Sequence, residues 1–376
     1  MTWSLIGSAT GITLISAPLL AAERELTSPP IFKQALPGYE YVFPRDHGSH
    51  NLFLTEWWYF TGHLLSEDGE RFGYELTFFR RALEDPQVWK NPSRWAFRQL
   101  YFAHLALTEV DNARFRFAEK ISRAGLGKAG AKTGMFHSWL DHWSAAAGTP
   151  DHQEFHLQAS TPEFGVDLNV TLLKPPIIHG LEGVSQKGSQ TGQASHYYSL
   201  TRLATKGVLW LDGEKKEVSG TSWMDHEFGS ESLAEGLVGW DWFSIQLESG
   251  YEIMAYWLRR EDGTFDAVSS GTLVAPDGGT HHLNQNDLKL DILEHWHSQA
   301  SGARYPSRWT LTIVPFDILL NITPQLPDQE LRTTKSTQIT YWEGAVEVEG
   351  RSGNAPVTGM GYVELTGYAE PYRPGS

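Results

Sequence analysis

The chain of 376 residues contains no cysteine. This absence excludes disulfides, thiolate metal ligands, a catalytic thiol and a lipidated cysteine. Lysine and arginine are also scarce, with 30 residues against 45 aspartates and glutamates, and the formal net charge is −15. Because nucleic-acid affinity depends on cationic side chains that contact phosphates, we expect no nucleic-acid partner.

The familiar signatures of catalytic and nucleotide-binding sites are missing as well. The chain has no GxSxG nucleophile elbow, no HExxH motif and no P-loop, which removes the easily recognised hydrolase and NTPase classes. Gly125, Gly127 and Gly130 match the GxGxxG spacing. A dinucleotide site also needs a strand before this loop, a helix after it and an acidic residue further on, and we see none of these. We therefore predict a simple loop or hairpin there.

Histidine is plentiful, with 15 copies. Three pairs stand close together in the sequence: His47 with His50, His281 with His282, and His295 with His297. Each pair lies in or beside a predicted loop, without fixed carboxylates alongside. Hydrogen-bonded or surface histidines are commoner than metal ligands, so we predict no metal and no other cofactor.

Long apolar runs are confined to the N-terminus, and no later segment is apolar for long enough to cross a bilayer. Residues 4–22 are apolar and uncharged and end in two alanines, as at a signal-peptide cleavage site, although a basic n-region is missing. We expect residues 1–22 to be a signal peptide and the protein to be periplasmic or secreted. The alternatives are that this segment is a retained membrane anchor or that the start codon is misassigned. Residues 23–45 contain four prolines, which predicts an extended lead-in.

Aromatic residues and glycine dominate what remains, with 12% aromatics, 15 tryptophans and 36 glycines. Large rings suit pleated, half-buried surfaces, and glycine suits hairpins and bulges. About sixteen short strands with turn signals between them predict an all-β fold of sandwiches or barrels with few helices. A division near Ser230 gives an N-terminal domain, 46–230, and a C-terminal domain, 231–376.

The densest group of titratable side chains lies in Ser222–Gly229. If this segment is a strand, Asp225 and Glu227 share one face with Trp223, and His226 lies on the other face. We therefore expect Asp225 and Glu227 to act as a pair that His226 cannot join directly.

Two further patches combine tryptophan with a carboxylate: Glu56 with Trp57 and Trp58, and Asp241 with Trp240 and Trp242. Each is either a salt-bridged strand end under core indoles or an aromatic wall with a desolvated carboxylate lining a cavity, where burial raises the pKa of the acid. Two such patches favour a pocket. The predicted ligand-binding residues are Glu56, Trp57, Trp58, Tyr59, Trp223, Trp240, Asp241 and Trp242.

Four segments carry a resemblance to a known family: Glu56–Leu64, Ser222–Gly229, Tyr341–Val346 and Gly361–Tyr368. In these segments the chain resembles the AttH and carotenoid 1,2-hydratase (CrtC-like) superfamily of bacterial envelope proteins, and the likeness spans residues 40–370. The resemblance implies two consecutive lipocalin-like antiparallel β-barrels packed together. Such barrels hold an apolar ligand inside or at the mouth.

The resemblance also implies a reaction. Carotenoid hydratases protonate an isolated double bond with an acid, stabilise the cation with aromatic faces, and capture water. Their Asp-His-Asn-aromatic motif is similar to the segment Asp225–Phe228, with Glu227 in place of the amide. Their tyrosine and following acid fall at Tyr256 and Leu258, where this chain lacks the acid. By resemblance, the catalytic residues are Asp225, His226, Glu227 and Tyr256.

Three hypotheses therefore remain open. In the first, the protein binds an extended apolar molecule, an isoprenoid or acyl lipid, in exchange with envelope or membrane-associated transport components. In the second, it is a hydratase or isomerase in which Asp225 or Glu227 donates the proton and His226 positions water. In the third, these acids are buried clasps between the barrels.

Overall fold

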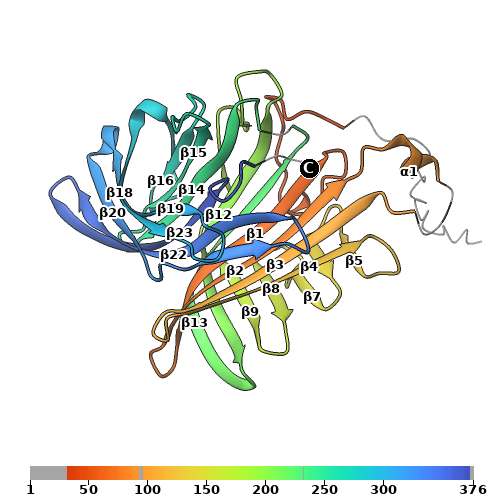
Figure 1. Cartoon of the computed structure of the whole chain (residues 1–376), viewed down its shortest axis with the longest axis horizontal. Coiled ribbons are helices and arrows are strands. Elements are labelled where there is room, and N and C mark those ends of the chain that lie inside the picture. Colours follow the sequence, from red (N-terminus) through yellow and green to blue (C-terminus); the bar gives the residue numbers. More distant parts are fainter. Residues whose placement is uncertain (1–31, 92, 94–95, 232, 373–376) are drawn as a thin grey trace, which may run out of the picture.

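The computed structural model describes residues 32–91, 93, 96–231 and 233–372, which fold into two antiparallel β-sheets (Figure 1). The predicted signal peptide, residues 1–22, lies outside the described residues. In the predicted lead-in, residues 32–44 form no helix and no strand. No helix in the described part of the chain is long and apolar enough to span a bilayer.

The first sheet contains 13 strands and curls back on itself. Across the sheet the order is β4-β3-β2-β1-β13-β12-β9-β8-β7-β6-β5, and β10 and β11 pair with β12. Near the far end, β6 also contacts β3 and β4, which makes this sheet a nearly closed barrel. The strands are β1 Thr55–Ser66, β2 Arg71–Ala82, β3 Gln99–Glu109, β4 Arg114–Arg123, β5 Ala129–Ala131, β6 His137–Leu140, β7 Trp143–Ala147, β8 Glu154–Ser160, β9 Phe164–Leu172, β10 Ile177–Ile178, β11 Ser185–Gln186, β12 Ala194–Leu211 and β13 Glu214–Gly229.

The second sheet contains ten strands and forms a half-barrel. Their order is β17-β16-β15-β14-β23-β22-β20-β19-β18, and β21 pairs with β22. The strands are β14 Leu237–Leu247, β15 Glu252–Arg260, β16 Ser270–Val274, β17 Thr280–Asn284, β18 Leu288–His297, β19 Arg304–Ile313, β20 Ile318–Pro324, β21 Glu330–Thr333, β22 Ile339–Ser352 and β23 Ala355–Thr366. The chain changes sheet between Gly229 and Leu237.

The prediction of an all-β fold is confirmed, although the described chain has 23 strands and the sequence indicated about sixteen. Strands as short as β10 and β11 have too few residues to show an alternating pattern. Helical structure among residues 32–91, 93, 96–231 and 233–372 is limited to α1 Pro86–Lys90 and three short 3₁₀ turns, η1 Arg45–His47, η2 Gln285–Asp287 and η3 Val314–Phe316. Helix α1 begins at Pro86, and the Asp85 side chain caps it by accepting a hydrogen bond from the Gln87 amide.

Strand alternation decides which side chains enter the barrel and which face the other sheet. In the β1–β13 pair, Trp58 lies opposite His226 and Tyr59 lies opposite Asp225. Trp58 belongs to the core of the barrel, whereas Tyr59 and Trp223 pack between the sheets. The face assignment predicted for Ser222–Gly229 is therefore confirmed.

The two sheets meet at one layer, where β1 contacts β23 and β2 contacts β22. We call this region the inter-sheet layer. Its buried apolar and aromatic residues are Tyr59, Tyr197, Trp223, Leu237, Trp242, Met254, Tyr256, Leu258, Ala345 and Tyr362, with Trp57 and Trp240 partly buried against them. Polar side chains from both sheets interrupt it.

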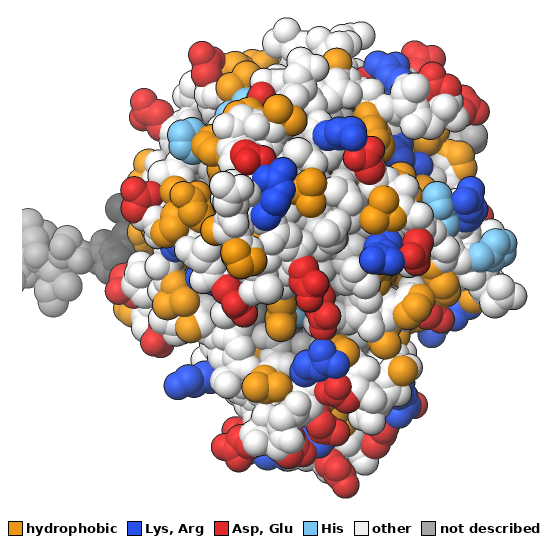
Figure 2. All heavy atoms as spheres, turned by 90° about the vertical axis from the view of Figure 1, so that its left-hand side faces the viewer, with side chains coloured by type: hydrophobic (Ala, Val, Ile, Leu, Met, Phe, Trp, Pro, Cys, Tyr) orange, Lys and Arg blue, Asp and Glu red, His pale blue; other side chains and the backbone are white. Residues whose placement is uncertain are grey.

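The outer surface differs from this layer. On the side that lies to the left in Figure 1, acidic and basic side chains are interspersed, and hydrophobic side chains gather only in small groups (Figure 2). Scattered exposed hydrophobic residues of this kind are normal on soluble domains. This face therefore shows no large hydrophobic patch, in contrast to the buried inter-sheet layer.

Candidate functional site

The inter-sheet layer holds most of the residues predicted to form the site. Every second side chain of a strand faces the same way, and the predicted residues that face the opposite sheet occupy such alternate positions. The predicted residues that the structure brings to the layer are Trp57, Tyr59, Trp223, Asp225, Glu227, Trp240, Trp242 and Tyr256.

Asp225 is the best-defined polar group of the layer. It accepts hydrogen bonds from the Tyr197 hydroxyl at 2.6 Å, from Trp223 Nε1 at 2.6 Å and from the Ser199 hydroxyl. Trp242, on the other sheet, donates from Nε1 to the Tyr197 oxygen at 3.1 Å. Burial raises the pKa of Asp225 to about 7, although the three hydrogen bonds favour the carboxylate. This carboxyl therefore gains and loses a proton near neutral pH.

His179, on the segment between β10 and β11, is linked to Asp225 through Ser199. His179 Nε2 lies 2.6 Å from Ser199 Oγ, and His179 Nδ1 lies 2.9 Å from Thr272 Oγ1 on the second sheet. Since the Ser199 hydroxyl donates to Asp225, it accepts from His179 Nε2–H, and Nδ1 then accepts from Thr272. Burial lowers the pKa of His179 to about 3, which keeps the ring neutral. A continuous hydrogen-bonded chain thus joins Asp225 to the other sheet.

Glu227 differs from Asp225 because it has a cationic partner. Lys187 Nζ lies 2.9 Å from Glu227 Oε1 and 4.7 Å from the centre of the Tyr256 ring. Burial lowers the pKa of Lys187, but Glu227, Tyr256 and Asp225 raise it by more, so the ammonium form is favoured. The Tyr256 hydroxyl donates to the Gln186 carbonyl at 2.9 Å. Asp225 and Glu227 therefore differ in their electrostatic surroundings, because Lys187 forms an ion pair with Glu227 and not with Asp225.

Three more acids lie in the layer, and the sequence analysis did not select them. Glu343 on β22 and Glu364 on β23 are directly opposite in the strand register. Glu343 accepts a hydrogen bond from the Tyr59 hydroxyl at 2.6 Å, and Glu75 on β2 accepts one from Thr77 at 2.6 Å. The second oxygens, Oε2 of Glu75 and Oε2 of Glu343, have no hydrogen-bond partner among the described residues. Both side chains are 1% exposed.

The protonation state of these three acids follows from their burial. Burial raises the pKa of Glu75 to about 8 and that of Glu364 to about 7. It raises the pKa of Glu343 well above its usual range, and the neighbouring carboxyls of Glu75 and Glu364 raise it further. Like charges directly opposite on neighbouring strands are unfavourable, which also favours the neutral forms. Glu75 and Glu343 are therefore largely protonated at neutral pH.

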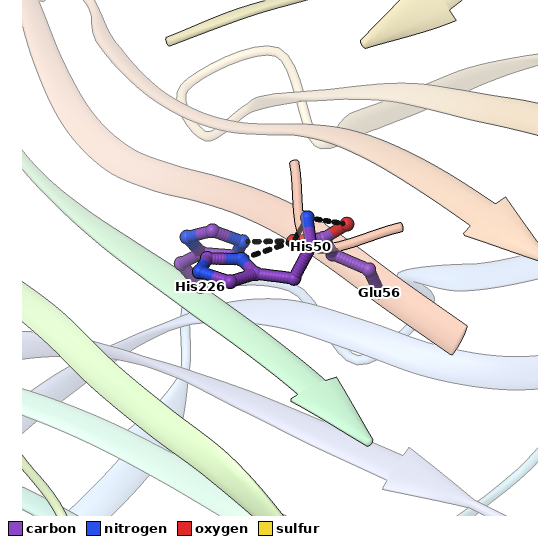
Figure 3. A group of neighbouring side chains, drawn as sticks. All are labelled: His50, Glu56 and His226. Carbon is purple, nitrogen blue, oxygen red and sulfur yellow. Dashed lines mark hydrogen bonds and ion pairs between the residues drawn. The ribbon is translucent and has the colours of Figure 1, made fainter. Parts of the chain in front are cut away.

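Glu56 and His226 lie elsewhere, inside the first barrel (Figure 3). Glu56 Oε1 accepts hydrogen bonds from His226 Nε2 and from His50 Nδ1, both at 2.8 Å, and Oε2 accepts from Arg80 Nε at 2.9 Å. The Tyr198 hydroxyl is 3.0 Å from the remaining ring nitrogen of His226. The structure therefore does not bring Glu56 and His226 to Asp225, because alternation turns both side chains to the barrel side of their strands.

His50, Glu56 and His226 place three potential ligand atoms within 4.8 Å of one another. No other group of at least three such side chains in the described part of the chain does so. Two atoms that share a tetrahedral zinc ion with bonds of about 2.05 Å lie about 3.3 Å apart. The contacts of 2.8 Å are shorter and fit direct hydrogen bonds, and Arg80 already neutralises the carboxylate.

Two other predicted ligand-binding residues also lie outside the layer. Asp241 points to the far face of β14, where Arg259 Nε and the Tyr368 hydroxyl both approach its Oδ1 to 3.0 Å. Trp58 lies in the barrel core and donates from Nε1 to the His47 carbonyl at 3.1 Å. Both expectations are corrected for the same reason, since neighbouring residues of a strand face opposite ways.

The residues of the inter-sheet layer are largely buried, and a small cavity borders them. The cavity beside Trp223 measures only about 10 Å³, and His63, Gln246 and Tyr362 also line it. A larger cavity of about 170 Å³ lies away from the layer, beside α1, and Val88, Ala96 and Phe97 are among the residues that line it. Pockets for small-molecule ligands usually measure roughly 300–1,000 Å³. Neither cavity reaches that size, so neither is the open hollow expected to be shared by the acids and indoles.

Sequence reasoning missed Glu75, Glu343 and Glu364, although a signal was present. Each acid lies in a strand between two residues that are large and apolar or glycine, as with Glu75 between Tyr74 and Leu76. An acid between such neighbours is expected to lie in a covered part of its strand. Tyr197, Ser199, His179 and Lys187 gave no comparable signal, because nothing in the sequence brings them to Asp225.

Comparison with known proteins agrees with this fold. The AttH-like family model matches residues 34–368. A crystal structure of an AttH protein from Nitrosomonas europaea superposes with a TM-score of 0.81 and 33% identity, covering 90% of this chain and 99% of that one. Kievitone hydratase from Nectria haematococca superposes with a TM-score of 0.68 and 16% identity, covering 91% and 98%.

A fungal enzyme is similar in sequence. The dehydratase asqC of Emericella nidulans is 22% identical over 249 residues. The match covers 65% of this chain and 66% of that protein, which is just under two thirds of its length. A hydratase thus shares this fold, and a dehydratase is similar to this chain in sequence.

Proposed function

This chain belongs to the AttH-like family, and from that premise we propose that it is a lyase that adds water to, or removes water from, an apolar substrate held in the inter-sheet layer. Asp225 carries the proposal. It is a buried carboxyl that has no Lys or Arg partner among the described residues and whose pKa of about 7 suits proton transfer in either direction.

The contrast with other buried acids supports a functional role. Glu56 pairs with Arg80, Glu252 pairs with Lys174 and Arg202, and Asp241 pairs with Arg259. Those acids have the cationic partners that a purely structural clasp requires. Asp225 is held only by neutral hydrogen-bond donors, which leave its proton free to exchange.

In the hydration direction, the protonated Asp225 gives its proton to one carbon of a double bond. A new C–H bond forms from the π electrons, and the other carbon becomes a cation. Trp223 and Trp242 belong to the same buried layer, and their aromatic rings stabilise the charge. Water then bonds to the cationic carbon and returns one proton to the Asp225 carboxylate, so the acid is regenerated. Dehydration is the reverse sequence.

The neighbours of Asp225 have distinct supporting roles. Tyr197 and Trp223 hold the carboxyl in place from two directions. The chain through Ser199 and the neutral His179 redistributes hydrogen bonds when the proton leaves. Because the cavity beside Trp223 measures only about 10 Å³, substrate entry requires surrounding side chains or the segment that carries Lys187 to move.

A carrier of an isoprenoid or acyl lipid is the second candidate function. The observation that favours it is the concentration of tryptophan and tyrosine rings between the sheets. Its periplasmic or secreted location and its transport partners remain predictions from the sequence. A carrier binds its ligand without turnover, so the two functions give different results in one experiment.

That experiment uses protein purified from its source together with the small molecules that co-elute. The mixture is incubated in water enriched in ¹⁸O, and mass spectrometry measures the label gained by the co-eluting molecules. We expect uptake with the native protein and a loss of at least about 1,000-fold in rate for Asp225→Asn, with ligand binding retained.

Asp167→Asn is the matched control, because Asp167 lies on the same sheet but is exposed and pairs with His156. It should keep the native rate of labelling. Ligand binding with no labelling by any form would support the carrier. Equal labelling by Asp225→Asn and native protein would disprove the role of Asp225.

A further inference from the structure

The buried acids of the layer include two with unused hydrogen-bonding capacity. Glu75 and Glu343 come from opposite sheets, and Oε2 of each has no partner among the described residues. Neither forms an ion pair with a described Lys or Arg, in contrast to the buried Glu56 and Glu252. An unsatisfied buried polar atom is unfavourable, and such atoms are few in native proteins. A ligand that satisfies them would remove that penalty.

We propose that Glu75 and Glu343 form a hydrogen-bonding site for an uncharged oxygen of the substrate, a carbonyl or a hydroxyl. The inference rests on the proposed function and names its substrate class: apolar molecules that carry a neutral oxygen close to the reacting double bond. Pure hydrocarbons and carboxylates are excluded from this class.

The position of the site relative to Asp225 supports this proposal. Tyr59 donates to Glu343, and Tyr59 is the direct cross-strand neighbour of Asp225. Asp225 also raises the pKa of Glu343, so the oxygen site and the proton-transfer site lie near each other in the layer. A single small substrate therefore spans both.

The charge of the layer selects against anions. Glu75, Glu343 and Glu364 are carboxyl groups that repel one another when ionised, and Lys187 is already paired with Glu227. A carboxylate or phosphate would bring further negative charge into the same region without a free cation to receive it. A carbonyl accepts the O–H of a neutral carboxyl instead. A hydrocarbon would leave these groups unsatisfied.

The test compares three probes of the same size: the ketone 4-phenylbut-3-en-2-one, the hydrocarbon 1-phenylbut-1-ene, and cinnamate. Dissociation constants for the full-length protein are measured by saturation-transfer NMR at pH 6.5. We expect the ketone to bind at least about tenfold more tightly than either of the others, as one good hydrogen bond implies.

Two paired variants identify the groups responsible. Glu75→Gln/Glu343→Gln keeps a neutral N–H donor at each position, so it should keep the preference for the ketone. In the native protein the ketone should bind more weakly at pH 9 as Glu75 and Glu343 ionise, whereas the Gln pair should show no such change. Glu364, Thr77, Tyr341, Tyr59 and Asp225 are the groups that influence these two carboxyls. Glu75→Leu/Glu343→Leu should bind ketone and hydrocarbon equally, and Glu343→Leu alone replaces it if the pair does not fold.

Several results would overturn this inference. Equal affinity of the native protein for ketone and hydrocarbon would do so, as would binding of none of the three probes. An unchanged preference for the ketone in the Leu variants would show that these two acids do not bind its oxygen. Failure of the proposed function gives a different result. If the native protein prefers the ketone but catalyses no hydration, the oxygen site is supported and the proposed reaction is disproved.

Discussion

The hydroxyl of Tyr59, on the first sheet, donates a hydrogen bond of 2.6 Å to Oε1 of Glu343, on the second sheet. Burial raises the pKa of the Tyr59 hydroxyl well above its usual range, so it remains a donor at any physiological pH. The bond connects the two sheets at a point where Oε2 of Glu343 has no hydrogen-bond partner within the described part of the chain. The candidate site therefore exists only when both sheets are assembled.

Removal of the Tyr197 hydroxyl should shift the pH dependence of turnover. The hydrogen bond from Tyr197 stabilises the carboxylate of Asp225 and lowers its pKa, so Tyr197→Phe should raise the pKa above its native value near 7. We expect the apparent pKa of kcat/KM to move to higher pH by about one unit. Tyr305→Phe is the control, since Tyr305 is buried in the core of the second sheet. A shift to lower pH, or no shift, would contradict the assignment of this pKa to Asp225.

The charge of Lys187 should influence the same profile. Glu227 raises the pKa of Asp225, and Lys187 neutralises Glu227. Lys187→Met should therefore move the apparent pKa of kcat/KM upward, and the double variant Lys187→Met/Glu227→Gln should return it toward the native value. A double variant that keeps the full shift would indicate that Lys187 acts on Asp225 by another route.

Stability should fall as pH rises through the titration of the buried acids. Glu75 has a pKa of about 8 in the folded protein and an ordinary value near 4.5 when unfolded, so between these values the folded state binds more protons. The free energy of unfolding therefore decreases with rising pH, by about 2 kcal/mol from Glu75 alone between pH 6.5 and 8.5. Glu75→Gln should show a flatter dependence in urea unfolding at these two pH values. An equally steep decline in the variant would assign the effect to other groups.

The Glu56 cluster should matter for stability and not for chemistry. Glu56→Gln leaves Arg80 buried without its carboxylate, which should lower the free energy of unfolding by roughly 3–5 kcal/mol. Turnover per folded molecule should stay close to native. Glu217→Gln is the control, because Glu217 is exposed on β13 and forms only a surface ion pair with Lys215. A stable Glu56→Gln protein that lacks turnover would place Glu56 in the reaction.

The sequence by itself was sufficient for the fold class and for the division of side chains within single strands. Tryptophan, glycine and short alternating segments predicted an all-β protein, and period-two alternation correctly separated Asp225 from His226. These are local properties, since they depend only on the backbone geometry of a strand and on neighbours along the chain.

Only the tertiary structure decided which acids are functional candidates. Glu56, Asp225 and Asp241 look alike in the sequence, each beside a tryptophan or in a tryptophan-rich segment, yet the fold gives Glu56 and Asp241 an arginine and gives Asp225 neutral donors. The packing of the second sheet on the first also brought Glu343 to Tyr59, from positions far apart in the chain. The charge state of a buried acid depends on such distant partners and on its removal from water, and neither property is encoded in the residues next to it.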